Sequence, residues 1–241
     1  MKNNFNFAIV TPSYNESKNI AILLNRIEES LPGSKIIIVD DSSTKENGKI
    51  KIIVKNKKNV ILISRLQKKG RGSAILDGFK VALEDKKIDY FFEMDSDLAH
   101  DPKEFIRFID KVNKHPYDLV IGSRYKQGGK IIHIAFYRTI MSRAINIFLY
   151  FWLGIHISDH TSGFRLYKRK TVEYLLSINL KSKGFITLSE IVYKLHKAGF
   201  SIAEVPITWN FREFGKSNVN YLELLNSLSF VVKMRFEDIF K

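Results

Sequence analysis

Short apolar segments that alternate with helix-forming segments constrain the fold of this chain more than any other feature of the sequence. The apolar segments cover residues 7–11, 35–40, 60–63, 90–93 and 117–123. Between the first two, residues 17–30 place apolar side chains at helical spacing. Continuous apolar strands that alternate with helices are typical of parallel sheets buried on both faces. We therefore predict an α/β fold with a mostly parallel, doubly wound sheet flanked by helices.

Two carboxylates follow the fourth apolar segment. Residues 90–97 read Y-F-F-E-M-D-S-D, which places Asp95 and Asp97 at the C-terminal end of a predicted buried strand. Open α/β sheets bind ligands at this edge. If the chain is still extended there, the two side chains point the same way and can together hold a divalent cation and, through it, phosphates. The alternative is a turn in which both carboxylates only cap backbone groups.

Further charged residues are predicted at the same edge. Asp40 and Asp41 end the second strand, and parallel strands bring their C-terminal ends together. Arg124 follows the fifth strand, where its guanidinium can bind a phosphate through two hydrogen bonds. Charges that recur at strand ends favour a ligand site over an isolated turn.

A glycine-containing segment precedes another predicted helix. Residues 67–74 read Q-K-K-G-R-G-S-A and bring three cations to the helix start. Because helix N-termini attract anions, this segment suits a bound anionic group. A tight turn with solvated lysines explains it equally well, and the segment matches neither the Walker A nor the G-x-G-x-x-G pattern.

Composition narrows the chemistry. The chain of 241 residues has no cysteine, which excludes disulfides, thiolate zinc sites and thiol catalysis. We also expect no metal site built from its six histidines. The formal net charge of +14 requires an acidic partner, which can be nucleic acid, anionic lipid or a phosphorylated substrate. Because no nucleic-acid-binding motif is present, we expect no nucleic-acid partner.

Residues 131–157 are rich in aromatic side chains and include Arg138 and Arg143. This composition fits a helix that lies in the plane of a membrane interface, while a helix packed in the core or against a second subunit is the alternative. The longest uncharged run, residues 144–158, has 15 residues and is shorter than the roughly 20 that span a bilayer. No secretory signal is visible at the N-terminus. The predicted location is therefore cytoplasmic, peripheral on the cytoplasmic face of a membrane.

Two pairs of residues have the spacing of helix capping boxes. Asp101 precedes Pro102 and Glu104 at the start of one predicted helix, and Thr187 precedes Glu190 at the start of another. Capping explains these carboxylates, although Glu190 can also be read as a general base.

The C-terminal part of the chain predicts a turn, a strand and a final helix. Residues 156–169 are predicted as a polar turn and residues 203–209 as a strand, with Pro206 indicating a sheet edge. We expect one domain over residues 1–220 and an amphipathic helix over residues 221–241 packed on or beside it.

Together these motifs resemble the family-2 glycosyltransferases, and within them the dolichol-phosphate mannose synthase branch. The resemblance runs from about Ala8 to Asn218 and rests on the order and spacing of short motifs. They are P-S-Y-N-E (12–16), V-D-D-S-S (39–43), G-R-G-S-A (70–74), D-S-D-L-A-H (95–100), G-S-R-Y (122–125), R-x-x-x-S-R (138–143), S-D-H-T-S-G-F-R-L-Y (158–167) and E-V-P-I-T (204–208). The resemblance implies a GT-A-type, Rossmann-like sheet.

The resemblance also implies a role for each matching residue. The residues that would bind the nucleotide-sugar donor are Pro12, Tyr14, Glu16, Val39, Asp41, Asp95, Ser96, Arg212 and Lys216. Mg²⁺ or Mn²⁺ would lie between Asp95 and Asp97. Asp97 and Arg124 would act in catalysis, and Arg138 and Ser142 would hold the acceptor phosphate. The implied reaction moves mannose from GDP-mannose to a polyprenyl phosphate, dolichyl or undecaprenyl, with inversion.

Two positions depart from the family pattern. Ala99 stands where many mannose synthases have Gln or Ser, so a bound metal would keep an extra water or use a backbone oxygen. The closing loop at residues 215–218 reads G-K-S-N and lacks the family's final lysine, for which Lys216 is the candidate replacement.

Two other functions are compatible with the residues. A UDP-sugar-dependent family-2 transferase would use the same sheet edge to move glucose or another sugar to a polyprenyl phosphate or a different acceptor. A basic, non-catalytic binding module would use only the positive charge. Competition between GDP and UDP distinguishes the two donors, and a substitution at Asp97 distinguishes an enzyme from a binding module.

Overall fold

The computed structural model describes residues 5–65, 67–132, 136–182, 184, 186–210 and 229–237. Within them, one seven-stranded sheet has the order β3-β2-β1-β4-β7-β5-β8. Its strands are β1 Phe7–Ser13, β2 Lys35–Asp40, β3 Val60–Ser64, β4 Tyr90–Glu93, β5 Leu119–Ser123, β7 Arg165–Lys168 and β8 Ile202–Pro206. Neighbouring strands are parallel except at β7, which is antiparallel to β4 and β5. The predicted mostly parallel α/β sheet is confirmed.

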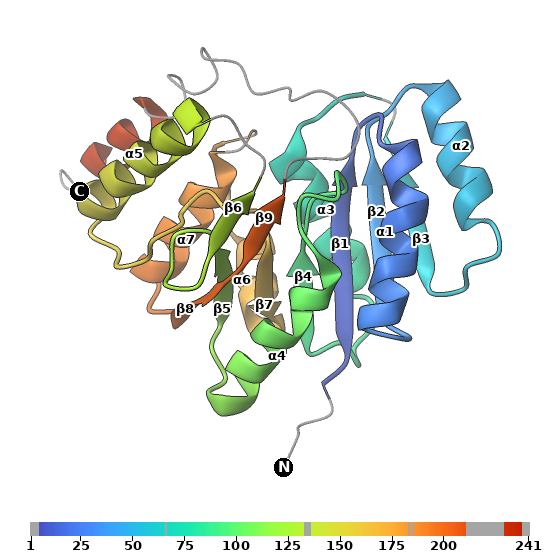
Figure 1. Cartoon of the computed structure of the whole chain (residues 1–241), viewed down its shortest axis with the longest axis horizontal. Helices are drawn as coiled ribbons and strands as arrows, with labels where there is room; N and C mark the ends of the chain where they lie inside the picture. The colour runs from blue at the N-terminus through green and yellow to red at the C-terminus, as the bar shows by residue number, and fades with distance from the viewer. Residues whose placement is uncertain are drawn as a thin grey trace.

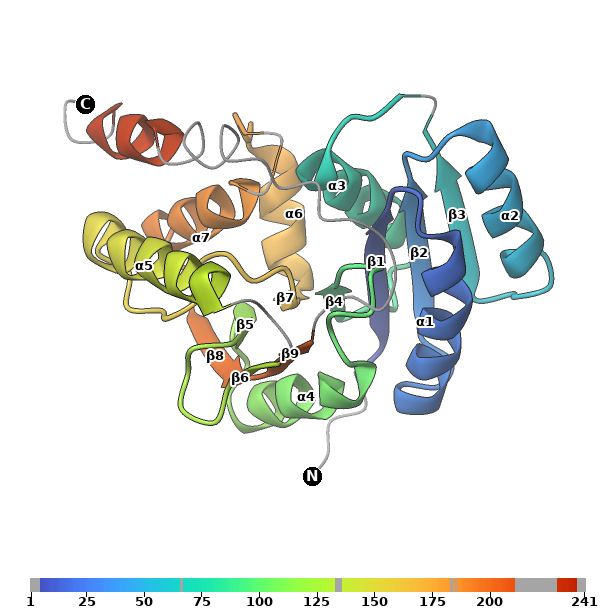
Figure 2. The ribbon, with the colours of Figure 1, turned by 45° about the horizontal axis from the view of Figure 1, so that its top comes forward.

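Helices cover both faces of this sheet. They are α1 Ser17–Ser30, α2 Thr44–Val54, α3 Arg71–Ala82, the 3₁₀ turn η1 Pro102–Glu104, α4 Phe105–Lys114, α5 Phe136–Leu153, α6 Arg169–Ser177 and α7 Thr187–Lys197. Figures 1 and 2 show α1 and α4 on one side of the sheet and α3, α6 and α7 on the other. A separate two-stranded sheet pairs β6 (Lys130–Ile132) with β9 (Thr208–Asn210).

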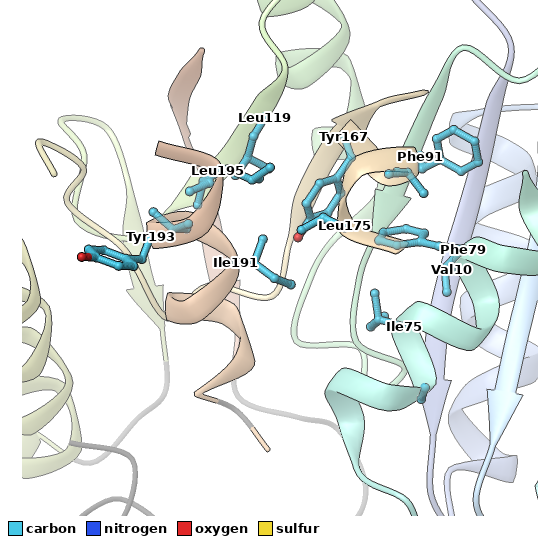
Figure 3. Close-up of a cluster of buried hydrophobic side chains, with 14 of the residues drawn as sticks. Val10, Ile75, Phe79, Phe91, Leu119, Tyr167, Leu175, Ile191, Tyr193 and Leu195 are labelled. Atoms are coloured by element: carbon cyan, nitrogen blue, oxygen red, sulfur yellow. The ribbon is translucent and has the colours of Figure 1, made fainter. Parts of the chain in front are cut away.

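Strands β1, β2, β4 and β5 are buried on both faces, because successive side chains point to opposite sides and helices cover both. In β1, Ile9 packs into the core under α1 and α4, whereas Val10 packs into the core under α3. Phe91 of β4 and Tyr167 of β7 meet Phe79 of α3 in this second core, with ring centroids 6.0 and 5.2 Å apart (Figure 3). Two buried faces explain why the strands read as continuous apolar runs.

In the second half of the chain, the strands differ from the prediction at two places. Residues 156–169, predicted as a polar turn, contain β7 and the start of α6, so that prediction was wrong for their second half. The predicted strand at residues 203–209 is divided between β8 and β9. Pro206 is the last residue of β8, which lies at the edge of the large sheet, as predicted.

The first half of one predicted capping box is confirmed, but both glutamates bind elsewhere. Asp101 caps η1, because its Oδ1 accepts a hydrogen bond from the Lys103 amide at 3.0 Å. The Glu104 carboxylate instead accepts the Thr208 amide at 2.9 Å and thereby joins η1 to β9. Glu190 accepts the amide of Lys181 at 2.9 Å. Both glutamates are buried structural tethers rather than capping-box partners.

Residues 229–237 are helical, and Val231 is fully buried in the core that also contains α3 and α7. The Phe236 ring lies 5.6 Å from the Trp152 ring of α5. The remaining parts of the predicted C-terminal helix, residues 221–228 and 238–241, lie outside the described residues. The division of the chain at residue 220 stays a prediction.

A pair of helical glycines tests how closely α3 packs on the sheet. A Cβ atom at Gly78 would lie 2.3 Å from Val10 Cγ1, whereas a Cβ atom at Gly48 in α2 meets nothing within 4 Å. We expect Gly78→Ala to lower the free energy of unfolding by about 1–3 kcal/mol through overpacking. The matched Gly48→Ala should raise it by about 0.5–1 kcal/mol through helix propensity. Urea unfolding measures both, and the same sign for the two variants would contradict this packing.

Candidate active site

The C-terminal ends of β1, β2, β4 and β5 meet at one edge of the sheet, the upper edge in Figure 1. Because β7 runs the other way, its N-terminal end and the preceding residues 158–164 lie at this edge as well. β1 lies at the point where the strand order reverses, with β2 on one side and β4 on the other. This is the position at which open α/β sheets bind ligands.

Asp95 and Asp97 lie in the loop after β4, which ends at Glu93. Strand β4 thus ends before both carboxylates, and the chain bends at residues 96–98. Ser96 fixes the loop to β1, because its hydroxyl donates to the Pro12 carbonyl at 2.8 Å. Asp97 Oδ1 accepts the Ala99 amide at 3.1 Å.

The acidic pair after β2 divides into two roles. Asp40 is fully buried, and its oxygens accept hydrogen bonds from Ser42 Oγ at 2.5 Å and Asn47 Nδ2 at 2.7 Å, so it holds the start of α2. Asp41 forms an ion pair with Arg65, with Nη2 2.6 Å from Oδ2. Its Oδ2 also accepts the Lys69 amide at 3.0 Å. Asp41 thus ties the segment before α3 to β2.

Three other predicted donor-binding residues, Tyr14, Glu16 and Val39, lie at or near the C-terminal ends of β1 and β2. Tyr14 is 37% exposed, with Lys68 Nζ 4.3 Å from its ring centre. The Glu16 carbonyl accepts the Asn19 amide at 2.9 Å in the first turn of α1. Val39 is fully buried in the core beneath α3, so only its backbone can face a ligand. The remaining two predicted donor residues, Arg212 and Lys216, lie outside the described residues.

Arg124 lies at the end of β5, and Asp159 holds its guanidinium. Arg124 Nε and Nη2 donate to the two oxygens of Asp159 at 2.7 and 2.8 Å, and Nη2 also donates to Thr161 Oγ1 at 2.7 Å. We predicted that the Arg124 guanidinium would bind a phosphate through two hydrogen bonds, but in the structure it makes those two bonds to the Asp159 carboxylate. Burial would raise the pKa of Asp159, but the Arg124 charge together with the hydrogen bonds from Arg124 and Thr161 lowers the pKa below its usual value.

The two predicted acceptor residues lie one helical turn apart on α5. Ser142 Oγ accepts a hydrogen bond from Tyr125 Oη at 2.7 Å, which links α5 to the residue after Arg124. Arg138 is exposed, and its Nε donates to Tyr137 Oη at 3.3 Å. The spacing of four residues puts Arg138 and Ser142 on the same side of the helix.

The family can be assigned by comparison with known proteins. The model of the family described as "Glycosyl transferase family 2" matches residues 8–176. The chain belongs to this family. The matched range includes Asp95, Asp97, Arg124, Arg138 and Ser142, so the predicted metal, catalytic and acceptor residues all lie in the family's own segment.

Named relatives of this family 2 glycosyltransferase agree with the predicted branch. A polyprenol monophosphomannose synthase from Mycolicibacterium smegmatis is 33% identical, over 88% of this chain and 80% of its own length. An undecaprenyl-phosphate mannosyltransferase from Micrococcus luteus is 32% identical, over 88% of this chain and 86% of its own length.

Solved structures of glycosyl transfer enzymes share the fold. Mannosyl-3-phosphoglycerate synthase from Rubrobacter xylanophilus superposes with a TM-score of 0.70 at 15% identity, covering 97% of this chain and 74% of that one. Glucosyl-3-phosphoglycerate synthase from Mycobacterium tuberculosis, in complex with Mn²⁺, UDP and glucosyl-3-phosphoglycerate, gives a TM-score of 0.65 at 18% identity, covering 95% of this chain and 78% of that one. At these identities the likeness shows the GT-A-type fold.

Three residues that hold the candidate site together were not predicted from the sequence. His100 is buried and accepts the Asp95 amide at Nδ1, 3.4 Å away, while its ring stacks on Phe164. Burial lowers the pKa of His100 to about 4, so the ring is neutral at pH 7 and acts as an acceptor. Asp159 and Arg71 are the other two. Both belong to motifs noted in the sequence, but the residues that they bind, Arg124 and Asp95, are distant from them in the sequence.

The donor set fits a hard divalent cation that shares its ligands with a substrate. Among the described residues, no group of three or more His, Cys, Asp and Glu side chains forms a complete metal site. Mg²⁺ typically uses one or two carboxylates and completes its shell with waters and substrate phosphates. Asp95 and Asp97 would supply the two carboxylates, and Asp95 is 27% exposed at its side chain.

Proposed function

We propose that the protein transfers mannose from a nucleotide donor, GDP-mannose, to the phosphate of a polyprenyl lipid such as undecaprenyl or dolichyl phosphate. One observation carries the proposal: the predicted donor and acceptor residues lie at the same edge of the sheet. Asp95 and Asp97 lie in the loop that Ser96 fixes to β1. Tyr125, the residue after Arg124, connects this edge to Ser142 on α5. Donor-phosphate and acceptor-phosphate groups would meet there. The names of the two relatives, a polyprenol monophosphomannose synthase and an undecaprenyl-phosphate mannosyltransferase, support this substrate class.

The donor side would use Asp95 and Asp97 to hold Mg²⁺ or Mn²⁺ against the donor diphosphate. When bound, such an ion stabilises the negative charge that develops on the leaving diphosphate. The Ser96–Pro12 hydrogen bond fixes the carboxylate loop to β1 before any ligand arrives. A related glucosyl-3-phosphoglycerate synthase has been solved with Mn²⁺, which supports a divalent cofactor without selecting Mg²⁺ or Mn²⁺.

The acceptor side would not need a general base. A phosphate is already ionised near neutral pH, so it can attack the sugar carbon without losing a proton. Arg138 and Ser142 would hold it, and in-line attack opposite the leaving diphosphate would invert the anomeric centre. The neutral His100 has its Nδ1 on the Asp95 amide and so serves the loop rather than proton transfer.

A donor screen tests this function. The protein is incubated with Mg²⁺ or Mn²⁺, undecaprenyl or dolichyl phosphate, and radiolabelled GDP-mannose, UDP-glucose or other sugar nucleotides. We expect organic-extractable label from GDP-mannose, and competition by GDP but not by UDP. Label from a UDP-sugar would establish the nearer alternative, and no label from any donor would overturn the proposal in favour of a non-catalytic binding protein.

A polyprenyl-phosphate acceptor would bring the protein to a membrane surface, and we propose that it binds there peripherally, on the cytoplasmic face. Among the described residues, no helix is long and apolar enough to cross a bilayer. Helix α5 instead carries an exposed apolar stripe at helical spacing. Its members, with their exposed fractions, are Tyr137 53%, Ile140 51%, Ile147 51%, Phe148 37% and Phe151 74%. Exposed Arg138 and Arg143 flank the stripe and suit anionic lipid.

Vesicle sedimentation with anionic lipid tests the stripe. We expect the double variant Ile147→Ser/Phe151→Ser to bind about tenfold or more weakly, because two apolar side chains no longer enter the interface. Ile52→Ser is the matched control, since Ile52 is 77% exposed on α2, at the opposite end of the sheet (Figure 1). Equal binding by both variants and the unsubstituted protein would mean that α5 does not face the membrane.

A further inference from the structure

The first residue of α3 reaches into the acidic strand end. Arg71 Nε donates to Asp95 Oδ1 at 2.8 Å, and Nη1 donates to Glu93 Oε1 at 2.5 Å. Nη2 donates to the Gly163 carbonyl at 3.3 Å. From the sequence, this arginine was one of three cations at a helix start that could bind an anionic ligand. In the structure it is bound to carboxylates of the chain itself.

Glu93 explains why a cation is needed at this point. Its side chain is only 1% exposed at the end of β4, and an ionised carboxylate is rarely buried without a charged partner. Arg71 supplies that charge, and Tyr167 Oη donates to the other oxygen of Glu93 at 2.6 Å. Burial would lower the pKa of Arg71, but Asp95 and Glu93 outweigh it and raise the pKa above its ordinary value. The guanidinium is therefore charged at every working pH.

The contact with Asp95 fixes the direction of a proposed metal ligand. Arg71 holds Oδ1 of Asp95 through a hydrogen bond. The other oxygen, Oδ2, lies near Gly163, where an added Cβ would be 3.2 Å away from it. Three carboxylates, at positions 93, 95 and 97, and one guanidinium leave two net negative charges, which match one divalent cation.

We propose that Arg71 is a positioning residue for the divalent-cation site: it clamps Asp95 through Oδ1 and neutralises Glu93, so that Asp95 and Asp97 are prearranged for the cation. This inference rests on the metal-dependent part of the proposed function. Partners that orient metal ligands commonly change metal affinity by 10–100-fold when they are substituted. Gly163 belongs to the same device, because a Cβ there would lie 2.3 Å from Arg71 Nη2 and displace the guanidinium.

Two variants test the clamp in different ways. Arg71→Lys keeps the positive charge, but a lysine cannot hold Asp95 and Glu93 with the fixed geometry of a guanidinium. Gly163→Ala keeps every charge and displaces the guanidinium by contact. Arg169→Lys is the matched control, since Arg169 also binds backbone carbonyls, those of Ile88 and Asp85, but at the opposite end of β4 and β7. Thermal unfolding checks that each variant is folded.

The measurement is the binding of Mn²⁺ by electron paramagnetic resonance, in the presence of GDP and without sugar or acceptor. We expect Arg71→Lys and Gly163→Ala to bind Mn²⁺ about tenfold more weakly than the unsubstituted protein, and Arg169→Lys to bind it equally. Unchanged affinity in either folded clamp variant would overturn the proposal, as would the absence of Mn²⁺ binding by the unsubstituted protein. If the Mn²⁺ affinities are as expected but the unsubstituted protein transfers no sugar, the proposed function is wrong and the role of Arg71 in cation binding is still supported.

Discussion

Asp97→Asn is expected to lower the rate of sugar transfer on the order of 10³-fold or more while leaving the protein folded. The reason is electrostatic, because the carboxylate would hold the cation that stabilises the leaving diphosphate, a contribution of several kcal/mol. Asparagine keeps the size of the side chain and an oxygen that can accept the Ala99 amide, so the turn after β4 survives. The measurement is the initial rate of label transfer at saturating donor and metal.

Asp101→Asn is the matched control for this variant. Asp101 lies in the same loop, and its only assigned role is to cap η1 through the Lys103 amide. Asparagine is also a good N-cap, so this variant should keep nearly full activity. Full activity in Asp97→Asn would mean that the carboxylates after β4 are only turn residues. Equal losses in both variants would point to the loop's shape rather than to a cation.

Asp159→Asn is expected to lower the free energy of unfolding by about 3–5 kcal/mol at pH 7, because it leaves the buried Arg124 guanidinium without its charge partner. Asp159 is fully buried, and the Arg124 side chain is only 13% exposed. Asp77→Asn is the matched control, since Asp77 pairs with Arg65 but is 48% exposed at its side chain. An exposed partner contributes about 0–1 kcal/mol. Urea unfolding measures both losses, and equal losses would contradict the assignment.

The Asp159 pair also predicts a dependence on pH. The pKa of Asp159 is lowered in the folded protein from an ordinary value of 3.8, so the unfolded chain binds a proton first as the pH falls. The stabilisation is complete above the unfolded pKa and is lost as the pH falls below it through the folded pKa. The stability difference between the unsubstituted protein and Asp159→Asn should therefore shrink between pH 5 and pH 3. A constant difference over this range would exclude the ion pair as its source.

The alternation of apolar runs and helices was enough to predict the sheet, because burial on both faces leaves a simple signature. Helix α2 has no such signature: only Asn47 and Ile50 of it are buried, so its sequence shows no apolar stripe. β7 was hidden for a different reason. Arg165 within it is fully buried and donates to the carbonyls of residues 160, 162 and 188, contacts that make a charged residue compatible with a central strand.

The candidate site residues that belong to short motifs could be predicted from the sequence. Their ion pairs with residues distant in the sequence could not. Asp95 and Asp97 are recognisable from their position after a strand. Arg71 binds Glu93 and Asp95 across 22 and 24 residues, and Arg124 binds Asp159 across 35. The local sequence around an arginine does not show whether its guanidinium binds a phosphate ligand or a carboxylate of the chain. The fold makes that distinction, because β4 and β7 bring these partners to one edge.

The central claim is that the carboxylates after β4 hold a divalent cation that in turn holds the donor diphosphate. A crystal structure with Mn²⁺ and GDP tests it most directly, since the anomalous signal of manganese locates the ion independently of any model. The account predicts one manganese peak within coordination distance of Asp95, Asp97 and the GDP phosphates, about 2.0–2.2 Å from their oxygens, with Arg71 still on Asp95 Oδ1. GDP bound at this edge with no manganese, or manganese bound away from both carboxylates, would contradict it.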